Sequence, residues 1–342
     1  MPVRVGISGL GRIGRLALRV CMSKPDIEVV AVNATTNAAT LAHLLKYDTV
    51  HGKWSADVVA DGDDLLINGR RIKLVSNRNP LLLPWGDLGV DVVLEATGKF
   101  TDRDSAAQHL EAGAKKVVIS TTGKSDDISI VYGVNHHLYD PDKHHVISGS
   151  SCTTNCLAPI AKVLHEKFGI VEGSMTTVHS FTGDQRSLDN PHKDLRRARS
   201  ASQAIVPTTT GAARGIGRII PELTGKLNGL SIRVPTPNVS LVDLVATVEK
   251  KVTADDINQA FVMAAQGELK GILDVCFEPL VSTDYIGNSH SSIVDAMSTM
   301  MIGERTAKVL AWYDNEMGFA HRMVDLMHFV GSRVAKVVDN TP

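Results

Sequence analysis

The chain contains 342 residues, of which 43% are hydrophobic and 21% are charged. This length suggests about two domains, and the composition excludes an intrinsically disordered chain. The formal net charge of −1 argues against nucleic acid or an anionic membrane as the main partner. No signal-peptide pattern opens the sequence, and no apolar run is long enough to span a bilayer. We therefore expect a cytoplasmic protein whose four cysteines are free thiols.

Strand-like and helix-like patterns alternate in the first third of the chain. Strands are predicted at 3–8, 27–32, 90–94 and 116–120, and helices at 12–22, 40–45 and 102–112. A β-hairpin is expected over 65–75, because Asn68-Gly69 in its middle suits a turn with positive φ. This alternation predicts a parallel sheet with helices on both faces.

Strands outnumber helices after residue 150, which favours an α+β domain with a mixed or antiparallel sheet. The elements expected there are helices at 152–168, 254–266 and 318–330, strands at 175–181, 230–234, 239–249 and 308–313, and a polar, basic loop over 182–203. We therefore predict two domains. The first contains residues 1–150 and is completed by a C-terminal helix within 315–342, and the second contains residues 151–314.

A glycine-rich motif follows the first predicted strand and opens the first predicted helix. Gly9-Leu10-Gly11-Arg12-Ile13-Gly14 fits the pattern G-x-G-x-x-G. The first glycine permits a tight turn, the second lets the backbone approach a pyrophosphate, and the third lets the helix pack on the strand. Amides at the helix N-terminus then bind the anion. The first domain is therefore predicted to be a Rossmann domain that binds a dinucleotide.

The end of the second strand bears on which dinucleotide is bound. An acidic residue is expected there, about 20 residues after the motif, where it bonds the ribose 2′-hydroxyl and repels a 2′-phosphate. Ala34 occupies this position, and Thr35 and Thr36 follow it. The missing carboxylate favours NADP, and use of both NADP and NAD is the alternative, because no arginine stands in this segment to hold the phosphate.

A cysteine begins the helix that opens the second half of the chain. The thiolate of Cys152 would be stabilised there by the positive end of the helix dipole. Cys156, one turn further on, is expected to be a buried small residue. His179 lies near the end of a predicted strand and is the candidate base. Adjacent histidines at 136–137 and 144–145 point apart if they lie on strands, so no metal site is expected.

Several segments resemble one enzyme family, the phosphorylating glyceraldehyde-3-phosphate dehydrogenases. These segments are SCTTNCLAP, TTVHS, NPHKDLRRAR, PTTTGAA, RVPTPNVS and WYDNE, and the resemblance covers essentially the whole chain. It implies a homotetramer that oxidises glyceraldehyde 3-phosphate with NAD(P) and inorganic phosphate to give 1,3-bisphosphoglycerate, reversibly, in glycolysis or gluconeogenesis. The nucleophilic thiol forms a thiohemiacetal and then a thioester, which phosphate cleaves.

The resemblance also implies the roles of individual residues. Cys152 matches the nucleophile, and His179 matches the general acid–base, which as an imidazolium would lower the thiol pKa. Ser151, Thr153, Thr210 and Gly211 match the pocket for the attacking phosphate, Thr182 and Arg233 match the pocket for the substrate phosphate, and Arg197 lies between the two. Arg12 and Ile13 match pyrophosphate contacts, Arg78 and Ser120 match positions on the adenine and nicotinamide ribose side, and Asn315 matches the residue that holds the nicotinamide carboxamide.

Some positions depart from the common family pattern. Ala34 and Asn190 resemble the second bacterial form, which works with NADP in the gluconeogenic direction. Ser8, Gly149 and Gly183 stand where asparagines are common, and Met317 stands where an aromatic residue is common. Gly149 and Met317 border the thiol and nicotinamide and bear on the turnover rate.

Two other functions remain open from the sequence. One is erythrose-4-phosphate dehydrogenase, a close relative that typically departs from the PHKDLRRAR and TTTGAA patterns, which are intact here. The other is a non-catalytic, cofactor-binding redox sensor that uses Cys152 as an oxidisable thiol. The intact residues His179, Thr182, Arg233 and Asn315 argue against a sensor.

Overall fold

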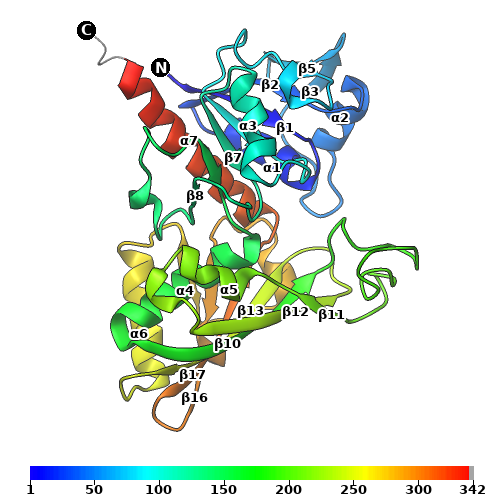
Figure 1. The fold of residues 1–342 in the computed structure, drawn as a ribbon. Helices are drawn as coiled ribbons and strands as arrows, with labels where there is room; N and C mark the ends of the chain where they lie inside the picture. The colour runs from blue at the N-terminus through cyan, green and yellow to red at the C-terminus, as the bar shows by residue number, and fades with distance from the viewer. Residues whose placement is uncertain (339–342) are drawn as a thin grey trace. The chain divides into compact units, whose positions relative to one another are not determined.

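The computed structural model describes residues 1–338, which divide into two compact units (Figure 1). The first unit comprises Met1–Tyr132, His136–Ser150 and the chain from Ala320 onward, and the second comprises Gly133–Asn135 and Ser151–Phe319. Residues 315–319, which were expected with the C-terminal helix, group with the second unit, and 339–342 lie outside the described residues. No helix within the described range is both long and apolar enough to cross a membrane.

The first unit is a Rossmann domain, as predicted. Its elements are β1 (Val3–Ser8), α1 (Arg12–Cys21), β2 (Ile27–Asn33), α2 (Ala38–Lys46), β3 (Val58–Asp61), β4 (Asp64–Ile67), β5 (Arg70–Val75), β6 (Val92–Glu95), α3 (Arg103–Glu111), β7 (Lys116–Ile119), β8 (Ile128–Ser129), β9 (Val146–Ser148) and most of α7 (Met317–Val338). The strands lie in the order β3-β4-β5-β2-β1-β6-β7-β9-β8. All neighbours from β5 to β8 pair in parallel, whereas β3, β4 and β5 pair antiparallel.

Glycines permit one close approach and two turns with positive φ in this unit. A Cβ atom at Gly14 would lie 1.9 Å from the carbonyl oxygen of Gly9, so α1 begins directly against the end of β1. Gly9 itself has a φ of 95°, which only glycine adopts without strain. The expected turn between β4 and β5 is also present, because Asn68 and Gly69 both have positive φ (49° and 76°).

The second unit contains a mixed sheet covered by helices. Its elements are α4 (Cys152–Phe168), β10 (Ile170–Ser180), β11 (Val206–Thr209), α5 (Ala212–Gly215), β12 (Leu227–Val234), β13 (Ser240–Val248), α6 (Ala254–Gln266), β14 (Leu273–Cys276), β15 (Ser292–Asp295), β16 (Met300–Ile302) and β17 (Thr306–Tyr313). The main strand order is β11-β12-β10-β13-β17-β15-β14. The pairs β10/β12 and β14/β15 are parallel and the others antiparallel, which confirms the predicted mixed sheet.

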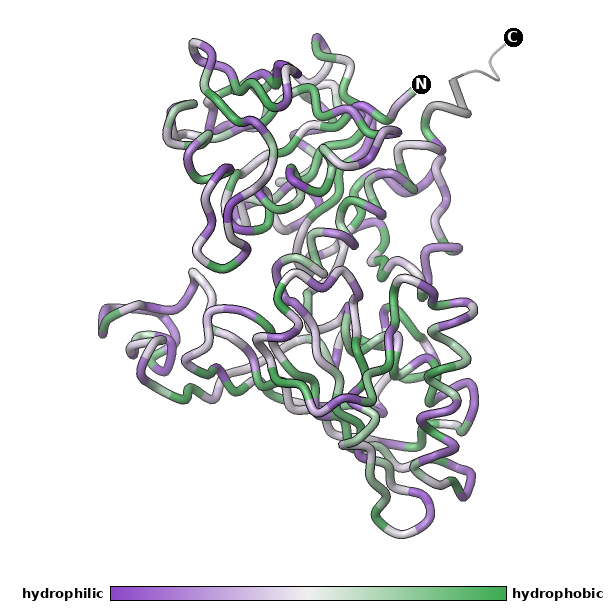
Figure 2. The backbone as a smooth tube through the Cα atoms, turned by 180° about the vertical axis from the view of Figure 1, so that it is seen from behind, coloured by the Kyte–Doolittle hydropathy of each residue, from purple (hydrophilic) through white to green (hydrophobic). Residues whose placement is uncertain are grey.

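The central strands of this sheet bury one face. Along β13 every second side chain, from Ser240 to Val248, is buried, and the side chains between them are only partly buried. Helix α4 contacts β10, β13, β15 and β17, and its residues from Thr153 to Ala161 are all buried. Hydrophobic residues concentrate on the strands, whereas the loop over 182–203 mixes hydrophilic and hydrophobic residues (Figure 2).

Most helix and strand limits agree with the sequence predictions, and the differences have physical causes. The limits of α4 and α6 agree to the residue, whereas β10 begins five residues earlier than expected. The expected final helix ends before Gly331, but α7 continues to Val338. Gly331 packs there against β1, since a Cβ atom would lie 2.2 Å from Val3 Cγ1. Strands β3, β8, β9, β11 and β14–β16 were not predicted, because two to four residues carry too little periodicity.

The close approach at Gly14 leads to a stability prediction. Gly14→Ala would force a methyl group against the Gly9 carbonyl and should lower the free energy of unfolding by about 2 to 3 kcal/mol. Gly11→Ala is the matched control, because a Cβ atom there meets nothing within 4 Å, and it should cost less than about 1 kcal/mol. Urea unfolding of both variants measures this, and equal losses would contradict the packing argument.

Candidate active site

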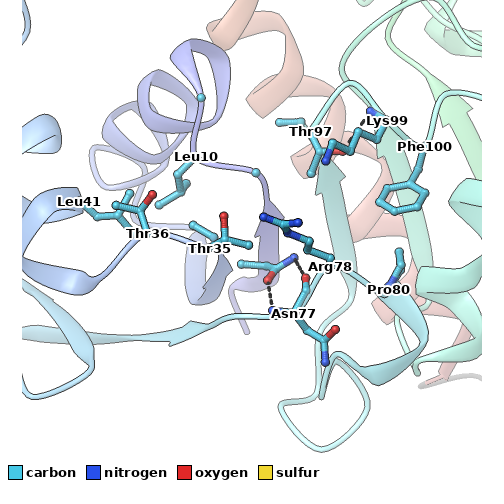
Figure 3. A pocket seen from close by; sticks show the side chains of 15 residues that line it. Leu10, Thr35, Thr36, Leu41, Asn77, Arg78, Pro80, Thr97, Lys99 and Phe100 are labelled. Atoms are coloured by element: carbon cyan, nitrogen blue, oxygen red, sulfur yellow. Dashed lines mark hydrogen bonds between the residues drawn. The ribbon is translucent and has the colours of Figure 1, made fainter.

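A pocket of about 330 Å³ opens at the carboxyl ends of β5, β2, β1 and β6 (Figure 3). In a parallel sheet these ends meet at one edge, which is where such folds bind ligands. Its lining residues are Gly9, Leu10, Gly11, Asn33, Ala34, Thr35, Thr36, Leu41, Asn77, Arg78, Pro80, Ala96, Thr97, Lys99 and Phe100. The pocket therefore brings the glycine-rich motif and the residues after β2 into one site.

The structure gathers some of the predicted cofactor residues at this pocket and leaves others outside its lining. Gly9, Gly11, Ala34, Thr35 and Arg78 line it. Those outside are Arg12, Ile13, Gly14 and Ser120 in this unit and Asn190 and Asn315 in the other.

Two of these outlying side chains have protein partners. The guanidinium of Arg12 donates two hydrogen bonds to the carboxylate of Asp48, and the hydroxyl of Ser120 donates to the Glu95 carbonyl at 3.0 Å.

Residues that follow β5 and β6 complete the pocket wall, and of these the sequence had indicated Arg78 but not Asn77, Pro80, Thr97, Lys99 or Phe100. Asn33 ties the end of β2 to Asn77, because its Oδ1 accepts from the Asn77 amide and its Nδ2 donates to the Asn77 carbonyl, both at 3.0 Å. Arg78 and Lys99 bring two cations to the wall, which contains no carboxylate. For Lys99, the available signal was its position shortly after a strand, but only the strand order shows that β6 flanks β1.

The thiol of Cys152 and the imidazole of His179 meet in the second unit. Cys152 is the first residue of α4, and the hydroxyl of Ser151 caps this helix by accepting from the Thr154 amide at 3.0 Å. His179 lies near the end of β10. Its Nε2 atom lies 3.4 Å from Cys152 Sγ, so the helix start and the strand end place a nucleophile beside a base.

Strand pairing places Arg233 beside His179. The two residues are directly opposite in the parallel pair β10/β12, and Arg233 Nη1 lies 2.9 Å from His179 Nδ1. A carbonyl oxygen only accepts, so the 2.7 Å contact with Ser180 places the proton of His179 on Nδ1. Arg233 Nη1 then donates to the same carbonyl, at 3.1 Å, and not to the ring. With its proton on Nδ1, the ring offers the lone pair of Nε2 to the thiol. Arg233 Nε is buried without a hydrogen-bond partner in the described chain.

Burial governs the protonation of the reacting pair. It raises the pKa of Cys152 above the ordinary value of a thiol, and the charge of Arg233 and hydrogen bonds from Thr153 partly offset this effect. Burial, and after it the charge of Arg233, lower the pKa of His179 to about 3. The expected pair of thiolate and imidazolium therefore does not agree with this environment, which favours a neutral thiol and a neutral imidazole.

A cluster of buried hydroxyl groups lies next to Cys152 and His179. Tyr313 OH lies 3.0 Å from Thr153 Oγ1 and 2.9 Å from Thr177 Oγ1, and its ring packs edge-on against His179. Cys156 is fully buried, and its thiol contacts Ser292 Oγ and the Ala311 carbonyl. Burial raises the pKa of Cys156 far above the ordinary value. Cys156 is therefore a core residue, as expected.

Asn315 is held at one end of its amide. Its Oδ1 atom accepts from the hydroxyls of Ser180 (2.9 Å) and Ser240 (2.8 Å), so the amide nitrogen is the end left for a ligand. Val239, directly before Ser240, has a φ of 66°, a strained conformation for a β-branched residue. The strain thus lies next to a residue that orients Asn315.

The predicted phosphate-binding residues lie on several elements. Arg197 Nη1 pairs with Asp184 at 2.5 Å and Arg197 Nε donates to Thr208 Oγ1 at 3.1 Å, while its charge also reaches His179. Thr210 and Gly211 follow β11, and α5, which begins after Gly211, contacts α4. The Thr182 carbonyl accepts from Gln185, and the Asn190 amide donates to Ala198, both at 2.9 Å.

Gly149 shows why one departure from the family pattern is accommodated. A Cβ atom there would lie 2.4 Å from both Sδ and Cε of Met323 on α7, so this methionine fills the space that a larger residue at 149 would need. Gly183, by contrast, has open space around it. Within residues 1–338, no group of three or more His, Cys, Asp or Glu side chains is arranged to hold a metal ion.

Known proteins match the chain along nearly its full length. The family described as glyceraldehyde 3-phosphate dehydrogenase matches with its NAD binding domain at residues 3–103 and its C-terminal domain at 151–315. A glyceraldehyde-3-phosphate dehydrogenase of Geobacillus stearothermophilus is 61% identical, with 97% of this chain and 99% of the relative aligned. Glyceraldehyde-3-phosphate dehydrogenases 1 and 2 of Bacillus subtilis are 56% and 53% identical, over 97% and 98% of this chain and 99% and 98% of their own lengths.

The position of Arg233 leads to a prediction about the thiol. Its positive charge favours the thiolate and disfavours the imidazolium, so it lowers the pKa of both Cys152 and His179. Arg233→Gln should therefore raise both pKa values and move the alkylation of Cys152 by iodoacetamide to higher pH. Alkylation rates of the Cys152 peptide, followed by mass spectrometry across pH, measure this shift.

Arg199→Gln is the control for this measurement, because Arg199 is exposed and paired with Asp189 at 2.9 Å. An Arg233→Gln profile that coincides with the wild-type profile would contradict the electrostatic role of Arg233.

Proposed function

The chain belongs to the glyceraldehyde-3-phosphate dehydrogenase family, and from this premise we propose that it oxidises glyceraldehyde 3-phosphate with inorganic phosphate to 1,3-bisphosphoglycerate, reversibly. The observation that carries the proposal is the 3.4 Å contact between Cys152 Sγ and His179 Nε2 at the start of α4. Such a contact suits a nucleophile activated by a base.

His179 takes the thiol proton as Cys152 attacks the aldehyde carbon. The environment favours neutral partners in the free site, so the proton crosses from Sγ to Nε2 when the new S–C bond forms. His179 then gives this proton to the former carbonyl oxygen, so the thiohemiacetal carries a hydroxyl. The neutral imidazole takes the hydroxyl proton back as hydride leaves the same carbon. Loss of the hydride gives a thioester on Cys152, and attack by phosphate releases the acyl phosphate and the thiol.

Anion binding is assigned to donors around this pair. Arg233 carries a buried, unpartnered Nε atom, which suits an oxyanion in the substrate-phosphate pocket together with Thr182. Arg197 is held by Asp184 and lies between the two phosphates in this proposal. Ser151, Thr153, Thr210 and Gly211 are assigned to the attacking phosphate. An arginine fork matches the geometry of phosphate oxygens.

The pocket of the first unit fits a dinucleotide. Gly9 permits the tight turn and Gly14 the close packing of α1 on β1. Gly11, which has open space around it, leaves room for the backbone to approach a pyrophosphate. We assign Arg12, Ile13, Arg78 and Ser120 to cofactor binding, with Asn315 and Asn190 contributing from the second unit. When bound, the nicotinamide supplies the hydride acceptor.

The composition of the pocket supports a preference for NADP over NAD. Ala34 stands where a carboxylate would repel a 2′-phosphate, and Thr35 and Thr36 offer hydroxyls beside it. Arg78 supplies the cation that the segment after β2 lacks, and Figure 3 shows its side chain directed into the pocket. The Bacillus subtilis enzymes 1 and 2 have nearly the same sequence identity to this chain, 56% and 53%. Identity therefore does not indicate the cofactor, and the proposed NADP preference rests on the pocket residues.

A homotetramer in the cytoplasm completes the proposal. Large hydrophobic side chains are exposed on the loop over 182–203 and beside it, among them Leu188 (72%), Leu195 (82%) and Ile205 (70%). Contact with other copies of the chain would cover them. The cysteines at 21, 152, 156 and 276 are all free, which suits a reducing compartment.

The reaction is tested by following nicotinamide absorbance with glyceraldehyde 3-phosphate, phosphate and either cofactor, with erythrose 4-phosphate as a second substrate. Cys152→Ser should lose nearly all activity, because a serine hydroxyl is much less acidic and less nucleophilic than a thiol and an oxygen ester conserves less of the oxidation energy. Cys156→Ser is the control and should stay active, since Ser292 and the Ala311 carbonyl can bond its hydroxyl. Folded wild-type protein that reduces neither cofactor would refute the enzyme.

The cofactor preference is tested at Arg78. Arg78→Gln should raise the KM for NADP about tenfold, because a charge-assisted bond to the 2′-phosphate is lost, and should change the KM for NAD little. Ala34→Asp should likewise weaken NADP more than NAD. Initial rates with each cofactor at fixed phosphate measure both, and equal effects on the two cofactors would refute the 2′-phosphate argument.

A further inference from the structure

Three polar side chains lie buried beneath the dinucleotide pocket without any role in the mechanism above. They are Trp85, His109 on α3 and Glu95 at the end of β6, and none is more than 1% exposed. Burying a carboxylate and an imidazole costs free energy unless their hydrogen bonds are satisfied. Each donor and acceptor of these three side chains therefore needs a hydrogen-bond partner within the protein.

The hydrogen bonds of this buried chain fix the position of every proton. Trp85 Nε1 lies 2.9 Å from His109 Nδ1, and an indole nitrogen only donates, so Nδ1 is the acceptor. The ring proton of His109 is then on Nε2, which donates to Glu95 Oε2 at 3.0 Å. The direction of donation thus runs from Trp85 through His109 to Glu95.

The other carboxylate oxygen of Glu95 holds the pocket wall. Glu95 Oε1 accepts from the Thr97 amide at 2.8 Å and from the Thr97 hydroxyl. Thr97 Oγ1 in turn accepts from the Lys99 amide at 3.1 Å. The Phe100 ring packs edge-on against His109, with ring centroids 6.2 Å apart. Thr97, Lys99 and Phe100 all line the pocket, so the buried chain contacts the wall at Glu95 and at His109.

The opposite side of this wall packs against the glycine-rich motif. A Cβ atom at Gly9 would lie 2.7 Å from the amide nitrogen of Thr97. The peptide before Thr97 is therefore fixed between Gly9 and Glu95. A wall that is already ordered spares the ligand the free energy of ordering it on binding.

We propose that His109 is a positioning residue for the dinucleotide. It acts through Glu95 to hold residues 97–100 in the shape that the cofactor meets, and it does not touch the cofactor itself. The inference rests on the proposed cofactor site in the first unit. Its consequence is that loss of the buried chain weakens dinucleotide binding and leaves the chemistry at Cys152 unchanged.

The test compares two replacements of His109 with opposite hydrogen-bonding ability. His109→Phe keeps a ring but leaves Trp85 Nε1 and Glu95 Oε2 unpartnered. His109→Gln keeps one acceptor and one donor. The probe is ADP-ribose, which carries the dinucleotide without the nicotinamide, and its Kd is measured by titration calorimetry. We expect His109→Phe to raise this Kd about tenfold and His109→Gln to restore most of the affinity.

Steady-state rates supply the second measurement. The KM for the nicotinamide cofactor should rise in His109→Phe, while kcat at saturating cofactor and the KM for phosphate stay at their wild-type values. His144→Gln is the matched control, because His144 also accepts a hydrogen bond at Nδ1, from the Asp140 amide at 2.9 Å, but does not line the pocket. If His109→Phe fails to fold, Thr97→Val removes the hydroxyl bond to Glu95 and should raise the Kd severalfold.

Each other outcome has a definite meaning. An unchanged Kd in His109→Phe, or in Thr97→Val where that variant is used, overturns the inference. Equal weakening in His109→Phe and His109→Gln also overturns it, because the size of the side chain rather than its hydrogen bonds would then set the affinity. Wild-type protein that binds no ADP-ribose would refute the cofactor site, and the inference with it, whereas wild-type binding with unaffected variants refutes the inference alone.

Discussion

The contact between Cys152 and His179 depends on α4 covering the buried face of the mixed sheet. The helix begins at the thiol, because Ser151 caps it at that point. Its buried residues then pack on β10, β13, β15 and β17. The same packing places the Tyr313 hydroxyl between Thr153 of α4 and Thr177 of β10. The reactive pair is thus held by the core of the unit, and a shift of α4 would separate thiol and imidazole.

Burial changes the pKa of both members of this pair. Removing the thiol and the imidazole from water disfavours the charged form of each. Arg233 is fixed opposite His179 by the register of β10 and β12. Its charge favours the thiolate of Cys152 and disfavours the imidazolium of His179, so it lowers the pKa of both groups. The same register therefore sets the charge that both reacting groups meet.

The sequence predicted those features that local chemistry determines. The start of α4 followed from Ser151 and Cys152 ahead of an apolar run, and the turn at Gly9 followed from its motif. What depends on strand order could not be predicted in the same way. Lys99 reaches the pocket because β6 flanks β1, and no local pattern shows this. Arg78 reaches it because β5 flanks β2, and only the family resemblance had indicated its role. The extent of α7 was also missed, because Gly331 serves close packing on Val3 rather than the end of a helix.

His109 and His179, the two histidines that are buried among the described residues, differ in the partners of their ring nitrogens. Trp85 Nε1 can only donate to His109 Nδ1, and Glu95 Oε2 accepts from His109 Nε2. Both ring nitrogens of His109 therefore have fixed hydrogen-bond partners, and its proton stays on Nε2. His179 Nδ1 donates to a backbone carbonyl, while Nε2 faces a thiol that can lose its own proton. Both histidines are almost fully buried, so burial alone does not distinguish a structural histidine from a reactive one. The distinction lies in whether a partner of the imidazole can exchange a proton with it.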